Sequence, residues 1–271
     1  MSKTRILYVC EEINPYLPES TISVLCRRLP PAMQDFGKDV RTFMPRYGVI
    51  NERRNQLHEV IRLSGMNLII DDNDHQLIIK VASIPAARVQ IYFIDNDDYF
   101  HRKAVLTDAH GAWFADNDER AIFFARGVLE TVKKLRWKPD VVHCHGWFSA
   151  IVPLYLRGTF AGDPMFSGCK IVVSLYNDGF AGELDATVRQ KIENEGIVDE
   201  RLSVLDTPSY ENLAKLVIDY ADGVIVEEKL DSEELRAYLA ESGKPVLDWN
   251  GEHGDPQYME IYQQFYDELL K

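Results

Sequence analysis

Cysteine is scarce in this sequence, and its spacing excludes a disulfide framework. Four cysteines lie far apart along the chain, with no Cys-Xaa-Xaa-Cys motif: Cys10, Cys26, Cys144 and Cys169. Small secreted domains use dense, regularly spaced cysteines instead. We therefore expect buried free thiols in a reducing compartment.

The sequence also has fewer positive than negative side chains, and it has no long apolar run. The chain has 30 basic against 43 acidic residues, which gives a net charge of −13. Because such a charge repels phosphate backbones and anionic lipids, we expect neither nucleic acid nor a membrane surface as a partner. No apolar run approaches the length of a membrane span, and the first run, residues 5–10, is too short for a signal sequence. These features favour a cytoplasmic protein.

Familiar catalytic and cofactor motifs are also absent. There is no Gly-Xaa-Ser-Xaa-Gly elbow, Walker loop or dinucleotide-binding fingerprint. The aspartate-rich segments 71–74 and 95–98 lack the acid spacing and central glycine of a calcium-binding loop. His143 and His145 could ligate a metal together with His110 or an acidic residue, but an ordinary pair at a sheet edge is the preferred interpretation. We expect no metal ion and no cofactor.

What the sequence does contain is an alternation of strands and helices. Residues 5–10 form a short apolar run typical of a buried parallel strand, and apolar residues recur at helical spacing over 20–36. A second strand at 40–44 completes a right-handed βαβ unit, although Pro30 and Pro31 should kink or split its helix. Further strands are predicted at residues 141–144, 170–175 and 224–226. The prediction is a three-layer, Rossmann-like α/β domain with a mainly parallel sheet.

The prediction is that the whole chain, 1–271, forms one domain. Two of its segments depart from the alternation of strands and helices. Residues 57–84 contain short β-rich runs without helical periodicity, which predicts a small antiparallel insertion in the sheet. Residues 255–271 predict the clearest helix, with Asp255 as its cap and Pro256 in its first position. Its apolar stripe should pack back on the domain and consists of Tyr258, Ile261, Tyr262, Phe265, Tyr266 and Leu269.

The run from residue 139 to 156 carries a resemblance to a known family. It reads Pro-Asp-Val-Val-His-Cys-His-Gly-Trp-Phe-Ser-Ala-Ile-Val-Pro-Leu-Tyr-Leu, and Asn-Asp-Glu-Arg precedes it at 117–120. Together with residues 5–15 and 37–47, these segments resemble the N-terminal domain of bacterial glycogen synthases and plant starch synthases. The resemblance covers most of residues 1–226.

This resemblance implies a glucosyltransferase fold and activity. Members of the family transfer glucose from ADP-glucose to the end of an α-1,4-glucan, between two Rossmann-like domains that face each other across a cleft, the GT-B arrangement. Only 45 residues follow Val226, too few for a second such domain. The expectation is that the second domain is missing from within the chain, while the family's last helix is kept as residues 255–271.

The chain departs from the family where the sugar nucleotide would bind. In place of a Lys-Thr-Gly-Gly run it has Pro18, Glu19, Ser20 and Thr21. The change removes the positive charge of the lysine, and Glu19 adds a negative charge where a diphosphate would lie. Both changes disfavour that ligand.

Two further motifs are altered. The family's His-Cys-His-Asp-Trp-His reads His-Cys-His-Gly-Trp-Phe at 143–148, and Tyr176 replaces a histidine that contacts the transferred glucose. A tyrosine donates a hydrogen bond but carries no positive charge near neutral pH. We therefore assign no intact catalytic residue and keep three vestigial candidates: His145, Tyr176 and Asn177. The candidates for ligand binding are Tyr16, Pro18, Glu19, Ser20, Trp147 and Asp178.

Three functions remain open. The chain could be an active ADP-glucose glucosyltransferase, completed by a partner chain that supplies the second half of the cleft. It could be a non-catalytic relative that binds an α-glucan or a nucleotide sugar, or a regulatory subunit in glycogen metabolism. Because losing one well-placed electrostatic group costs about 3 kcal/mol of barrier, we favour a binding or regulatory relative without transferase activity of its own.

The surface at the strand ends, which would face the cleft, is rich in aromatic residues. Aromatic residues at the strand ends, Tyr16, Trp147, Tyr176 and Phe180, could stack on sugar rings or simply plug a disused cleft. Exposed Trp147 and Phe148 beside Tyr16 would form a sizeable apolar patch. We expect partial cover of this face by residues 227–250, together with a homodimer or another protein partner.

Overall fold

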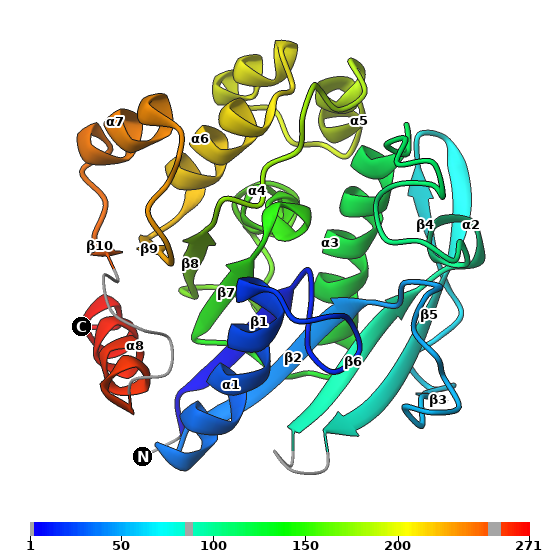
Figure 1. Cartoon of the computed structure of the whole chain (residues 1–271), viewed down its shortest axis with the longest axis horizontal. Helices are drawn as coiled ribbons and strands as arrows, with labels where there is room; N and C mark the ends of the chain where they lie inside the picture. The colour runs from blue at the N-terminus through cyan, green and yellow to red at the C-terminus, as the bar shows by residue number, and fades with distance from the viewer. Residues whose placement is uncertain (1–2, 85–88, 249–255) are drawn as a thin grey trace.

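A mainly parallel sheet runs through the molecule (Figure 1), and the computed structural model describes residues 3–84, 89–248 and 256–271. Within these residues ten strands follow the order β10-β9-β8-β7-β1-β2-β6-β5-β3, with β4 paired to β5 off this path. The pairs from β10 to β6 are parallel, whereas β5 is antiparallel to β3, β4 and β6. The predicted α/β fold with a small antiparallel insertion is confirmed. The strands are β1 (Arg5–Cys10), β2 (Asp39–Pro45), β3 (His58–Glu59), β4 (Met66–Ile70), β5 (Asn73–Ile84), β6 (Val89–Asp95), β7 (Val141–His145), β8 (Lys170–Leu175), β9 (Gly223–Val226) and β10 (Val246–Asp248).

Helices cover both faces of this sheet. In Figure 1, α1 and α8 lie on one face, and α3, α4 and α6 lie on the other, which gives three layers. The helical elements are α1 (Thr21–Asp35), α2 (Asp97–Phe100), α3 (Asn117–Lys134), η1 (Trp147–Ser149), α4 (Ile151–Arg157), α5 (Val188–Asn194), η2 (Glu200–Asp206), α6 (Tyr210–Tyr220), α7 (Glu233–Glu241) and α8 (Pro256–Leu269). None of the helices in the described part of the chain combines the length and the apolar character that crossing a membrane requires.

The first helix is not divided at its two prolines. Helix α1 runs unbroken from Thr21 to Asp35 with Pro30 and Pro31 inside it, so the expectation of a split is wrong. The prolines remove two backbone donors, but Leu29 and Met33 on either side of them are fully buried. Burial of this apolar face outweighs the lost hydrogen bonds.

The central strands fix where the functional residues meet. In the parallel register of β1 with β7, Tyr8 lies beside His143 and Cys10 beside His145. In that of β7 with β8, His145 lies beside Ser174. The carboxyl ends of β1, β7, β8 and β9 therefore lie at one edge, where ligands bind in open α/β sheets.

Helix α8 lies against the sheet near α1. Tyr258, Tyr262 and Tyr266 are fully buried and Phe265 is nearly so, while the remaining two residues of the predicted stripe, Ile261 and Leu269, are half-buried. The predicted cap Asp255 lies outside the described residues. All four cysteines are buried free thiols.

Candidate functional site

The turn after β7 forms the floor of the candidate site. Gly146 has a φ of +82°, and a Cβ added to it would lie 2.4 Å from Oε2 of Glu11. Only glycine fits there, because the backbone is left-handed and a carboxylate occupies the space of a side chain. The next two residues, Trp147 and Phe148, then present their backbone N–H groups at the site.

Two carboxylates already hold these N–H groups. The Phe148 N–H donates to Glu11 Oε2 at 3.2 Å, and the Trp147 N–H donates to Asp178 Oδ2 at 2.8 Å. The hydroxyl of Tyr210 donates to Asp178 Oδ1 at 2.9 Å. The structure thus joins two predicted residues, Trp147 and Asp178, to Glu11, which the sequence analysis missed.

Both carboxylates are held in surroundings that disfavour their charge. Burial, followed by the neighbouring charges of Asp178 and Glu12, raises the pKa of Glu11 well above its ordinary value. Burial also raises the pKa of Asp178, against the opposing effect of its hydrogen bonds from Trp147 and Tyr210. A phosphate group at this turn would add further negative charge beside two carboxyls that already resist ionisation.

The altered turn before α1 has a structural role of its own. Ser20 is the N-cap of α1 and accepts the Ser23 N–H at 3.0 Å, while its hydroxyl donates to Glu12 at 2.5 Å. Pro18 and Glu19 are exposed. These three candidates lie at the outer surface near the start of α1. They make none of the hydrogen bonds described for Trp147 and Asp178 at the turn after β7.

The vestigial candidates His145 and Tyr176 face each other inside the protein. His145 Nδ1 lies 2.8 Å from the Tyr176 hydroxyl, and His145 Nε2 is buried without a hydrogen-bond partner. Burial lowers the pKa of His145 to about 4. Both side chains are almost completely buried, and their polar atoms meet each other inside the protein.

A chain of hydrogen bonds joins α8 to the sheet behind these residues. Tyr8 and Tyr266 hydroxyls are 3.2 Å apart, the Tyr266 hydroxyl lies 2.7 Å from His143 Nδ1, and His143 Nε2 lies 2.9 Å from Ser174 Oγ. The Ser174 hydroxyl donates to Glu227 at 2.5 Å. Because this uses the only proton of Ser174, His143 Nε2–H donates to Ser174 and its Nδ1 accepts from Tyr266. Burial lowers the pKa of His143 well below its ordinary value, which favours the neutral ring in which Nδ1 accepts.

Glu227, at the end of β9, is the acceptor at the end of this chain. It also accepts the hydroxyl of Tyr258 at 2.5 Å and that of Tyr262. Three hydroxyl donors and nearly complete burial make it a structural anchor for α8. No local pattern points to this role, because an acid after a strand is usually a solvated residue.

Asn177 also serves the structure. Its N–H donates to the Glu228 carboxylate at 3.0 Å, its side-chain amide donates to the Lys229 carbonyl at 2.8 Å, and its Oδ1 accepts the Asp231 N–H at 2.8 Å. These bonds join the loop after β8 to the loop after β9. An open pocket of about 330 Å³ lies between these loops and the start of α6.

This pocket combines aromatic walls with polar side chains. Phe180 is half-buried and packs against the rings of Trp147 at 4.9 Å, Trp113 at 5.3 Å and Tyr210 at 6.0 Å between centroids. The lining residues are Tyr176, Asn177, Gly179, Phe180, Ala181, Tyr210, Glu211, Leu230, Asp231, Ser232 and Leu235.

The expected apolar patch at the strand ends does not exist. Trp147 is 5% exposed, Phe148 is fully buried and Tyr16 is 7% exposed. The chain covers them itself, because Trp113 and Phe180 pack on Trp147, and Phe93 packs edge-on against Tyr16 at 4.9 Å. The patch therefore supplies no reason for a partner on this face.

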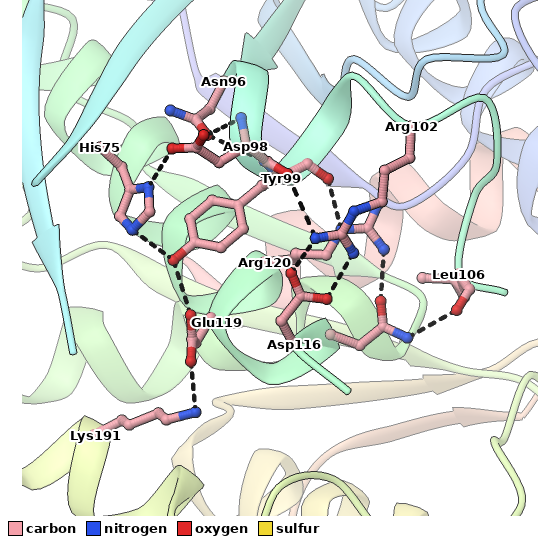
Figure 2. Close-up of polar contacts among 11 residues, drawn as sticks. His75, Asn96, Asp98, Tyr99, Arg102, Leu106, Asp116, Glu119, Arg120 and Lys191 are labelled. Atoms are coloured by element: carbon pink, nitrogen blue, oxygen red, sulfur yellow. Dashed lines mark hydrogen bonds and ion pairs between the residues drawn. The ribbon is translucent and has the colours of Figure 1, made fainter. Parts of the chain in front are cut away.

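The Asn117 to Arg120 segment belongs to a separate polar network (Figure 2). Lys191 Nζ contacts Glu119 Oε1 at 2.8 Å, and Tyr99 donates its hydroxyl to the other oxygen of Glu119 at 3.0 Å. Arg120 is fully buried, donates to the Tyr99 carbonyl at 2.8 Å and to Asn117 at 2.5 Å, and lies 5.8 Å from the Phe148 ring centroid. Through the contact of Arg120 with the Phe148 ring, this segment supports the turn after β7. Among the residues described, no three His, Cys, Asp or Glu side chains are placed to hold a metal ion.

Comparison with known proteins identifies the family. Residues 5–248 match the family model described as the starch synthase catalytic domain. The chain belongs to this family. It is 38% identical over 194 residues to the glycogen synthase of Chlorobium limicola (strain DSM 245 / NBRC 103803 / 6330), covering 71% of this chain and 40% of that protein. It is 33% identical over 267 residues to the glycogen synthase of Chlorobium phaeobacteroides (strain DSM 266 / SMG 266 / 2430), covering 91% and 54%.

A solved member of the starch synthases has the same fold. The catalytic domain of starch synthase IV from Arabidopsis thaliana, determined with ADP and acarbose, superposes with a TM-score of 0.72 at 16% identity. The match covers 91% of this chain and 51% of that one. The chain spans about half the length of the relatives it matches.

Within this starch synthase-type domain, Gly146 offers a test of the site's packing. Replacing Gly146 with Ala should lower the free energy of unfolding by about 2–4 kcal/mol, because the left-handed backbone is strained and the new Cβ meets Glu11. Chemical denaturation would measure the loss. In a Glu11→Ala background the same change should cost less, since only the backbone strain remains.

The matched control for this variant is Gly162→Ala. Gly162 is exposed, and an added Cβ would have no atom within 4 Å. This control should be neutral or slightly stabilising. Equal effects at both positions would contradict the packing described for Gly146.

Proposed function

We propose that this chain binds the end of an α-1,4-glucan and does not transfer glucose on its own, so that it acts as a binding or regulatory relative of the glycogen synthases. The observation that carries the proposal is that Glu11 and Asp178 accept the N–H groups of Phe148 and Trp147. Backbone N–H groups at such turns are what an incoming phosphate would use. Here the chain's own carboxylates take them.

A nucleotide sugar meets a second obstacle at the neighbouring turn. Its diphosphate would have to displace the two carboxylates and would then face Glu12 and the exposed Glu19. The family's lysine at this turn is replaced by Pro18, which offers neither charge nor donor. Desolvating a diphosphate among carboxyl groups is unfavourable, so ADP-glucose should bind poorly.

An uncharged glucan suits the pocket beside Phe180. The C–H face of a pyranose packs on an aromatic ring, and its hydroxyls donate to carboxylates such as Glu211 and Asp231. The size of the pocket, about 330 Å³, is enough for a sugar unit. The relatives named glycogen synthase, and the starch synthase determined with acarbose, support an α-glucan as the ligand.

The deciding experiment combines catalysis with binding. Radiolabelled ADP-glucose offered with a glycogen primer should give no incorporation above a heat-killed control, whereas maltotriose should bind and change the fluorescence of Trp113 and Trp147. Phe180→Ala should weaken maltotriose about tenfold, the effect of one lost aromatic contact.

Phe36→Ala provides the control for the binding measurement. Phe36 is 36% exposed after the end of α1 and does not line the pocket, so maltotriose affinity should stay unchanged. Incorporation of glucose by the chain alone would overturn the catalytic half of the proposal. Failure of maltotriose to bind would overturn the other half.

A further inference from the structure

We propose, resting on the glucan-binding function above, that Glu211 and Asp231 restrict the pocket to uncharged glucan ends and reject ends that carry a phosphate group. Glu211 lies in the first turn of α6, and Asp231 lies in the loop before α7. Both line the pocket from opposite elements. Within the described residues neither carboxylate has a hydrogen-bond or ion-pair partner, so both remain available to a ligand.

No positive side chain balances these carboxylates inside the pocket. Its described lining residues include neither Lys nor Arg. Arg236, on α7, donates to the backbone carbonyls of Leu230 and Asp231 and lines the neighbouring pocket instead. Glu228 adds a further carboxylate nearby, and it accepts the Asn177 N–H.

The two helix starts at the pocket also disfavour anions. Ser209 caps α6 and accepts the Asn212 N–H, and Ser232 caps α7 and accepts the Leu235 N–H. Acidic residues already occupy the first turn of each helix, among them Glu211. A phosphate at either helix start would therefore meet a serine cap on one N–H group and negative charge in the first turn.

The same groups favour a neutral sugar. Hydroxyl groups donate to carboxylates in hydrogen bonds stronger than those between neutral partners, while the half-buried ring of Phe180 offers an apolar surface. A phosphate ester on the terminal glucose would place two negative charges beside Glu211 and Asp231. Like charges side by side disfavour binding, and salt screens the effect because the pocket is open to solvent.

Maltose and maltose 6′-phosphate are the probes that test this discrimination. By titration calorimetry at low salt, maltose 6′-phosphate should bind about tenfold more weakly than maltose, and high salt should narrow the ratio. The double variant Glu211→Gln, Asp231→Asn should bind both sugars within about twofold of each other, because it keeps hydrogen-bonding groups and loses both charges.

A matched variant separates the local charges from the net charge of the chain. Glu241→Gln together with Glu260→Gln removes two exposed carboxylates that do not line the pocket, and it should leave the ratio unchanged. Equal binding of both sugars to the natural chain would overturn the discrimination while leaving glucan binding intact. Absence of maltose binding would overturn the proposed function and the discrimination with it.

Discussion

Ending the chain after residue 255 should lower the melting temperature by roughly 10 to 20 °C or leave the protein insoluble. Helix α8 buries Tyr258, Tyr262, Phe265 and Tyr266 against the body of the domain. Burial of four aromatic side chains stabilises the fold by about 5 kcal/mol or more, even after the entropy of ordering the helix is subtracted. Thermal unfolding followed by circular dichroism measures the change.

Loss of α8 would also remove hydrogen-bond partners from buried polar groups of the sheet. Glu227 would lose the hydroxyls of Tyr258 and Tyr262, and His143 would lose that of Tyr266. A chain shortened only by the exposed Lys271 is the control and should melt like the full chain. An unchanged melting temperature after removal of the whole helix would show that α8 serves a partner and not the stability of the domain.

The elements that local pattern decides could be predicted from the sequence. The strands at Arg5–Cys10 and Lys170–Leu175 and the helix at Pro256–Leu269 lie where their apolar patterns predict them. These segments are short apolar runs or clear helical stripes, so neighbouring residues carry the information. The behaviour of α1 at Pro30 and Pro31 depends on burial against distant strands, which no local pattern reveals.

The candidate site was predictable only in part, because its contacts join distant parts of the chain. Trp147 and Asp178 could be named from the motifs, but Glu11 meets the Phe148 N–H across 137 positions. The sequence also placed Trp147 on the surface, since Trp113 and Phe180, which cover it, come from separate loops. In the same way, the tyrosines of α8 read as an apolar stripe, whereas their hydroxyls meet buried acceptors.

Acid should destabilise this protein through its buried histidines. The pKa of His145 falls from 6.5 to about 4 on burial, so the folded state binds its proton later than the unfolded state does. The stability that comes from keeping His145 neutral is present above pH 6.5 and is lost as the pH falls towards 4. The loss amounts to about 3 kcal/mol. Glu11 and Asp178, whose pKa values are raised, act in the opposite direction and lose stability as the pH rises.

Replacing His145 with Asn isolates the histidine's share of this pH dependence. The asparagine amide keeps a hydrogen-bonding group near the Tyr176 hydroxyl and deletes Nε2, which has no partner. Urea denaturation at a series of pH values should show the difference between the natural chain and His145→Asn shifting by about 3 kcal/mol between pH 7 and pH 4, in favour of the variant at acid pH. For His110→Asn, a change at an exposed position, the free energy of unfolding should vary with pH as it does in the natural chain. If the stability of His145→Asn also varies with pH as that of the natural chain does, the neutral buried imidazole is not what makes the fold sensitive to acid.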